Sequence, residues 1–124
     1  MTNTEHLEGD RDGGLLAWQW ENYAAVHGHR RNLLIHVLTA PVFMAGTVAV
    51  VAAPFTSGWL ALAGVAAIVF AIAAQGRGHG MEAAPPIPFR GPLDVVARIF
   101  AEQWITFPRY VLSGGLSRAF ARAR

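Results

Sequence analysis

Two long runs of apolar residues occupy the middle of the sequence. The first covers residues 33–53 and the second residues 59–75, with a short Pro-Phe-Thr-Ser-Gly segment between them. A helix needs about 20 apolar residues to cross the hydrocarbon core of a membrane, so the first run is long enough and the second is near the lower limit. The pattern predicts an all-α fold built on a membrane-spanning helical hairpin. A buried hairpin in a soluble protein is the alternative.

The segments on either side of these runs are amphipathic. Residues 15–27 mix aromatic and polar side chains, which is typical of a helix at the membrane–water interface, although a soluble amphipathic helix has the same pattern. Residues 93–112 carry an apolar stripe at helical spacing and predict an interfacial helix that is broken near Pro108. On this helix, Asp94, Arg98 and Glu102 are spaced to pair in series.

These elements form one membrane domain, residues 15–112, between two tails. Residues 1–14 are acidic and lack a basic start followed by an apolar stretch, so they predict a disordered tail and no secretory signal. Residues 113–124 form a basic tail that suits anionic lipid head groups. Arginines flank the hairpin at its two outer ends, so the positive-inside rule puts both termini in the cytoplasm. We expect an integral protein of a bacterial inner membrane.

Composition narrows the possible functions. The chain has 124 residues, a formal net charge of +2 and no cysteine, which excludes disulfides and thiolate chemistry. The basic residues flank apolar segments and form no dense patch, so we expect no nucleic-acid partner. Small residues in both runs predict close contact between the two helices, and they could also support a homo-oligomer.

Four of the five histidines gather at the same end of the hairpin. His27 and His29 precede the first run, His36 lies less than a turn inside it, and His79 follows the second run. An antiparallel hairpin brings these stretches together, and neutral imidazole is the commonest protein ligand for transition metals. An ionisable group inside a span is costly and usually functional. The pattern predicts a metal site, with isolated histidines bound to lipid head groups or carbonyls as the alternative.

Helix geometry leaves open which early histidine takes part. His29, Asn32 and His36 share one helix face, whereas His27 and His36 lie on opposite faces of a straight helix. His27 can therefore join the site only if the chain bends, and Gly28 offers a place for a bend. Asn32 could cap a helix or orient a histidine ring.

Glu82, three residues after His79, is the candidate carboxylate ligand. Two or three histidines with one carboxylate form the ligand set of non-haem Fe(II) oxygenases. Glu82 could equally pair with Arg77 or Arg90. Tyr23 is a candidate neighbour of the ligands, with an aromatic residue of the interfacial belt as the alternative.

The spacing of these residues resembles a family of small membrane proteins related to fungal 2-hydroxy-fatty-acid (2-hydroxypalmitate) dioxygenase. The family pattern Tyr-x3-His-x4-Asn-x3-His, followed by a proline, reads here as Tyr23, His27, Asn32, His36 and Pro41. After an apolar hairpin the family has a Gly-His pair, a glutamate and a proline, which read here as Gly78-His79, Glu82 and Pro85.

The resemblance covers about residues 23–112. It implies an Fe(II)-dependent dioxygenase that uses O2 to shorten a long-chain 2-hydroxy fatty acid by one carbon. The metal ligands and catalytic residues that it implies are His27, His36 and His79, with Glu82 as a further ligand. The basic residues that could hold the substrate carboxylate are Arg30, Arg31 and Arg77. The competing functions are a non-catalytic membrane subunit or assembly factor and a lipid-binding protein.

Overall fold

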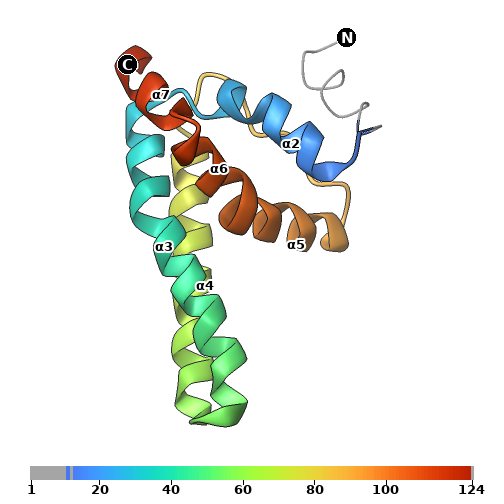
Figure 1. Ribbon diagram of the computed structural model, residues 1–124, viewed down its shortest axis with the longest axis vertical. Coiled ribbons are helices and arrows are strands. Elements are labelled where there is room, and N and C mark those ends of the chain that lie inside the picture. Colours follow the sequence, from blue (N-terminus) through green and yellow to red (C-terminus); the bar gives the residue numbers. More distant parts are fainter. Residues whose placement is uncertain (1–10, 12, 124) are drawn as a thin grey trace.

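A computed structural model describes Arg11 and residues 13–123 of the chain. These residues form helices and no strand, so the predicted all-α fold is confirmed for the described part. The elements are α2 (Leu15–Tyr23), η1 (Ala24–Val26), α3 (Arg30–Ala52), η2 (Ala53–Phe55), α4 (Gly58–His79), α5 (Pro92–Ala101), the π-helix η3 (Glu102–Thr106), α6 (Phe107–Leu112) and α7 (Gly115–Arg122). Figure 1 shows α3 and α4 as a long hairpin with the other helices gathered at its open end.

Both helices of the hairpin are long and apolar enough to cross a membrane. Helix α3 begins at Arg30, before the predicted residue 33, because the ring of His29 caps it and accepts a hydrogen bond from the N–H of Arg31 at 3.2 Å. Helix α4 continues past the predicted residue 75 as far as His79. It packs closely along α3, and this packing outweighs the weak helix propensity of Gly76 and Gly78.

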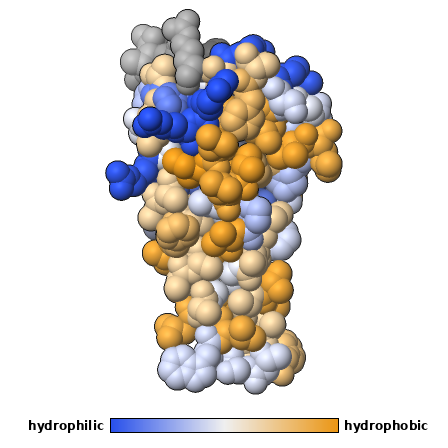
Figure 2. Space-filling model, turned by 90° about the vertical axis from the view of Figure 1, so that its left-hand side faces the viewer, coloured by the Kyte–Doolittle hydropathy of each residue, from blue (hydrophilic) through white to orange (hydrophobic). Residues whose placement is uncertain are grey.

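Most side chains of the hairpin face outward. Only 28% of the most apolar window around α3 is buried, and only 17% of that in α4. The core helix of a soluble protein would be mostly buried, so this exposed apolar surface suits contact with lipid. On the face shown in Figure 2, apolar residues extend along the hairpin, and the most hydrophilic residues gather at the end far from its turn.

The two long helices come into backbone contact at Gly46 and Gly64. A Cβ atom on Gly64 would lie 2.5 Å from the carbonyl oxygen of Gly46, and one on Gly46 would lie 2.7 Å from that of Gly64. Only glycine fits at both positions, because the obstacles are backbone atoms. The close approach predicted from the small residues is therefore present, and it fixes the separation of α3 and α4.

The remaining helices form a layer across the open end of the hairpin. Helices α2 and α5 lie side by side and roughly crosswise to α3 and α4 (Figure 1). The amide of Gln19 donates to the carbonyl oxygen of Arg98 at 3.0 Å, and Arg11 pairs with Asp94 at 2.6 Å. These contacts tie the start of the described chain to α5. The predicted N-terminal tail lies, for residues 1–10 and 12, outside the described residues.

The predicted break near Pro108 is absent, since residues 92–112 are helical throughout. The irregularity is the π-helix η3, which ends two residues before the proline. A proline lacks an N–H and its ring clashes with the carbonyl four residues earlier, here that of Trp104. The wider π-turn accommodates this without ending the helix. The segment predicted as a basic tail contains α7, whose Ala119 is buried in a cluster with Leu33 and Tyr110.

Candidate metal centre

Three histidine rings from three separate elements meet at the open end of the hairpin. His27 follows η1, His36 lies near the start of α3, and His79 ends α4. The ring centroids are 4.7 Å apart for His27 and His36, 4.8 Å for His27 and His79, and 5.1 Å for His36 and His79. Each pair of rings is nearly perpendicular. The structure thus brings together the three histidines that the resemblance implies.

His27 reaches this group because the chain bends between η1 and α3. Residues 27–29 are not helical, so His27 and His36 do not belong to one straight helix. The geometric preference for His29 assumed such a helix, and His29 instead caps α3. The bend needs no special backbone at Gly28, which lacks a positive φ and where a Cβ atom would meet only Glu82 Oε2 at 3.8 Å.

Backbone carbonyl groups fix the orientation of two of the rings. Nδ1 of His27 lies 2.7 Å from the carbonyl oxygen of Tyr23, and Nδ1 of His36 lies 2.9 Å from that of Asn32. A carbonyl oxygen only accepts, so each Nδ1 donates its N–H to the carbonyl, and each Nε2 is left facing the other side chains of the group. Nε2 of His27 and His36 and Nδ1 of His79 are buried without a hydrogen-bond partner. Three such nitrogens in one place call for a bound group.

A fourth donor comes from Glu102 in the π-helix η3. Its Oε1 lies 3.3 Å from Nε2 of His27 and 3.3 Å from Nε2 of His36. One donor atom from each of these residues and from His79 lies within 4.8 Å of the others. Single π-turns inside α-helices occur often at functional sites, and here the turn begins at the residue that points into the group.

The carboxyl group of Glu102 is negatively charged and is held by Tyr23. Burial raises the pKa of Glu102, but the rings of His27 and His36 outweigh burial and hold this pKa well below its usual value of 4.5. The hydroxyl of Tyr23 donates to Oε1 at 3.1 Å, and its ring stacks on His27 with centroids 3.8 Å apart. Burial, and then the charge of Glu102, raise the pKa of Tyr23 well above 10.0, so the hydroxyl remains a donor.

These four side chains fit a transition-metal ion. An ion with bonds of about 2.1 Å holds its donors no more than about 4.2 Å apart, so the group needs to contract by only about half an ångström. Imidazole and carboxylate are common ligands for divalent transition metals, and the charge of Glu102 offsets part of the charge of the ion. The group could therefore hold a metal ion.

Glu82, which the sequence suggested as a ligand, lies outside this group. Its carboxylate accepts hydrogen bonds from the N–H of Gly28 at 3.0 Å, the N–H of His29 at 2.9 Å and the side-chain amide of Asn32 at 2.8 Å. All three contacts stabilise the bend before α3. Asn32 does not cap a helix, and its backbone carbonyl oxygen orients the ring of His36. Glu82 and Asn32 therefore position the site and do not supply its donors.

Acid should loosen this bend. Burial raises the pKa of Glu82, but hydrogen bonds from His29, Asn32 and Gly28 outweigh burial and lower the pKa below its usual value of 4.5. A carboxyl group whose pKa is lower in the folded state stabilises the fold above its unfolded pKa, and this contribution is lost as pH falls through the folded pKa. Protection of the amide hydrogens of Gly28 and His29 against exchange should therefore fall below about pH 4.5. The Glu82→Gln variant should show low protection already at neutral pH, and an unchanged acid transition in that variant would contradict this role.

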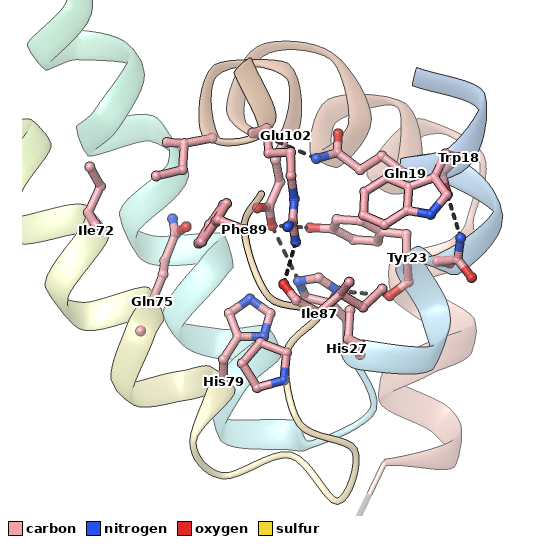
Figure 3. Close-up of a pocket in the computed structure, with 16 residues that line it drawn as sticks. Trp18, Gln19, Tyr23, His27, Ile72, Gln75, His79, Ile87, Phe89 and Glu102 are labelled. Atoms are coloured by element: carbon pink, nitrogen blue, oxygen red, sulfur yellow. Dashed lines mark hydrogen bonds and ion pairs between the residues drawn. The ribbon is translucent and has the colours of Figure 1, made fainter. Parts of the chain in front are cut away.

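A cavity of about 230 Å³ lies beside the metal group. Figure 3 shows Gln75 and His79 facing it from α4, Tyr23 and His27 from the other side, and Glu102 between them. Its remaining wall is mainly apolar and includes Trp18, Val26, Ile72, Ile87, Phe89 and Ile99. A mainly apolar cavity with a few convergent polar groups at one end is the usual form of a site for a small molecule.

The arginines predicted to bind a substrate carboxylate do not line this cavity. Arg30, Arg31 and Arg77 are exposed at the surface. The arginine at the cavity is Arg98, from α5. It belongs to α5, which lies far from the histidines in the sequence and is not beside either apolar run.

Comparisons with known proteins found no relative. No family model matches the sequence, and neither a curated protein nor a solved structure matches it. The geometry of the four side chains alone therefore supports a metal centre.

Proposed function

We propose that this protein is a membrane-embedded Fe(II)-dependent dioxygenase that shortens 2-hydroxy fatty acids by one carbon. The observation that supports this most is the convergence of three imidazole rings and one carboxylate, with three buried nitrogens lacking partners. This donor set extends the two-histidine, one-carboxylate set of non-haem Fe(II) oxygenases by one ring. The motif around Tyr23, His27, Asn32 and His36 supports the substrate class, since it resembles that of the 2-hydroxy-fatty-acid dioxygenases.

The reaction needs no reductant besides its own substrate. A 2-hydroxy fatty acid and one O2 give the acid one carbon shorter, CO2 and water, and the four electrons that O2 accepts come from the substrate. Iron held by these residues would supply the redox chemistry with O2. Within the chain, Tyr23 keeps His27 and Glu102 in position, and the apolar wall of the cavity excludes water from the bound acid.

The location of the site supports a lipid substrate. The metal group lies at the end of two helices long and apolar enough to cross a membrane, so it would sit near the membrane–water boundary. Arg30, Arg31 and Arg77 lie at the same end, and the positive-inside rule puts that end on the cytoplasmic side. A fatty acid dissolved in the inner leaflet would present its carboxyl group at this depth.

The test is iron content and product formation in the purified protein. Loaded with Fe(II) in detergent, the protein should consume O2 with 2-hydroxyhexadecanoic acid and release pentadecanoic acid. The His36→Ala and His79→Ala variants should lose the iron and at least about a hundredfold in rate, because each removes a ligand. The His29→Asn variant is the matched control, since asparagine keeps an acceptor for the α3 cap.

Two results would count against the proposal. Unchanged iron in both alanine variants would reject a site built from these histidines. Iron binding without consumption of the 2-hydroxy fatty acid would reject the reaction and would favour a non-catalytic membrane subunit.

A further inference from the structure

We infer that a single-chain fatty acid enters this site directly from the bilayer, through an opening between α4 and α5, and that the end of its acyl chain stays in lipid. The identity of its polar end rests on the proposed function. The path of the chain follows from the packing of the hairpin, the size of the cavity and the outer surface of α4.

The space between the two long helices is closed to an acyl chain. Gly46 and Gly64 are in backbone contact at one level of the hairpin. Nearer the metal group, Gly78 packs against Asn32 so closely that a Cβ atom would collide with the asparagine side chain. A chain whose polar end lies at the histidines must therefore leave the site on another side.

The cavity itself is too small to enclose a long-chain acid. Pockets that enclose a drug-sized ligand measure about 300–1,000 Å³, whereas this cavity measures about 230 Å³. It has room for a polar end and the first part of a chain. The rest of the chain has to leave the cavity.

Ile72 marks the place where the cavity meets the lipid-facing surface. Its side chain lines the cavity and is 40% exposed. Figure 3 shows Ile72, Gln75 and His79 in succession along α4. Helical spacing of three and four residues continues this side of α4 away from the metal group. The residues on that continuation are Val69, Val65 and Leu62, all exposed and all apolar.

Helix α5 supplies the opposite side of the opening. Ile99 lines the cavity, and Val96, three residues before it on the same side of α5, is exposed. A chain that passes between Ile72 and Ile99 therefore meets apolar side chains on both sides. The guanidinium of Arg98, which also lines the cavity, is bound to the carbonyl oxygens of Ile87 and Pro88. A single apolar stripe on α4 beside a cavity of this size suits one acyl chain, which favours a free fatty acid over a lipid with two chains.

Photolabelling tests the path without depending on turnover. The protein would be reconstituted in phosphatidylglycerol nanodiscs, both without added metal and loaded with Zn(II). The probe is 2-hydroxyhexadecanoic acid with a diazirine near the middle of its chain, and mass spectrometry locates the adducts. We expect adducts on α4 at Val65, Val69 and Ile72 and on α5 at Ile99.

Two tryptophan variants provide the comparison. Ile72→Trp fills the opening and should reduce labelling of α4 about tenfold. Leu38→Trp is the matched control, because Leu38 is exposed and apolar on α3 and lies as far from Gly46 as Ile72 does from Gly64. It should leave labelling unchanged. Circular dichroism and Zn(II) binding of both variants confirm that they fold.

Affinity gives a second measurement. If the end of the chain stays in lipid, 2-hydroxydodecanoic and 2-hydroxyoctadecanoic acids should bind with equal affinity per mole fraction in the nanodisc. A chain enclosed by protein would instead show a length limit.

The inference fails if the outward face of α3 is labelled as strongly as α4, or if Ile72→Trp is labelled like the unmodified protein. The two proposals fail separately. Labelling at Ile72 without product formation would reject the dioxygenase reaction alone, and product formation without labelling at Ile72 would reject the entry path alone.

Discussion

The Glu102→Gln variant should lose tight metal binding, whereas Glu82→Gln should keep it. Oε1 of Glu102 lies 3.3 Å from Nε2 of both His27 and His36, and its carboxylate is the only negative charge in the group. Glutamine keeps the shape of the side chain and an acceptor for Tyr23, but three neutral rings and an amide must then hold the cation. We expect affinity to fall at least about a hundredfold, since even changes beside a ligand cost roughly ten- to a hundredfold.

Glu82→Gln changes only the bend that carries His27. Its carboxylate touches the backbone of Gly28 and His29 and the amide of Asn32, and it is not a member of the donor group. Affinity in this variant should fall by no more than about tenfold. Competition with a chromophoric chelator measures both affinities, and the absorption spectrum of bound Co(II) shows whether a carboxylate ligand is lost. A weaker affinity in Glu82→Gln than in Glu102→Gln would mean that the carboxylate ligand is misassigned.

The hairpin could be predicted because its signal is local. Residues 33–53 and 59–75 are mainly apolar and lack Asp, Glu, Lys and Arg. Two such segments joined by a short turn have few stable arrangements other than a helical hairpin. The helix ends could not be predicted, because they depend on contacts between segments. The cap by His29 sets the start of α3, and the packing of Gly78 against Asn32 lets α4 continue to His79.

The histidines of the site could be predicted in part. Their positions around an antiparallel hairpin pointed to His36, His79 and one of the two earlier histidines. A straight helix favoured His29, and only the resemblance to the dioxygenase family implied His27. The bend that brings His27 rather than His29 into the group is held by Glu82, which follows α4 and is far from this bend in the sequence. No local pattern signals such a contact.

Glu102 was missed for a related reason. Its spacing from Asp94 and Arg98 predicted a ladder of charges on the surface of one helix. The structure retains the first step of that ladder, with Arg98 and Asp94 3.7 Å apart. The π-turn that begins at Glu102 changes the direction of the Glu102 side chain. The carboxylate of Glu102 therefore lies beside His27 and His36. The turn depends on the packing of the helix layer, which the pattern of apolar residues does not reveal.

The Gly64→Val variant should destroy the metal group without touching any of its residues. A Cβ atom on Gly64 would lie 2.5 Å from the carbonyl oxygen of Gly46 and 2.8 Å from Cγ2 of Val50. A backbone carbonyl cannot move alone, so valine has to push α3 and α4 apart. Because His36 is on α3 and His79 is on α4, their rings separate with the helices. Overpacking of this kind costs about 1–3 kcal/mol, and more where backbone is the obstacle.

The Gly58→Val variant is the matched control on the same helix, since a Cβ atom at Gly58 would have no neighbour within 4 Å. Gly64→Val should lower the thermal midpoint in detergent and lose metal affinity, and Gly58→Val should do neither. The thermal midpoint reports the stability of the fold, and the metal affinity reports the spacing of the ligands. If Gly64→Val were destabilised but bound metal like the unmodified protein, the spacing of the helices would not control the site, and the hairpin would serve only to anchor it. Loss of both would show that the backbone contact of two glycines sets the distance across which the rings of α3 and α4 meet.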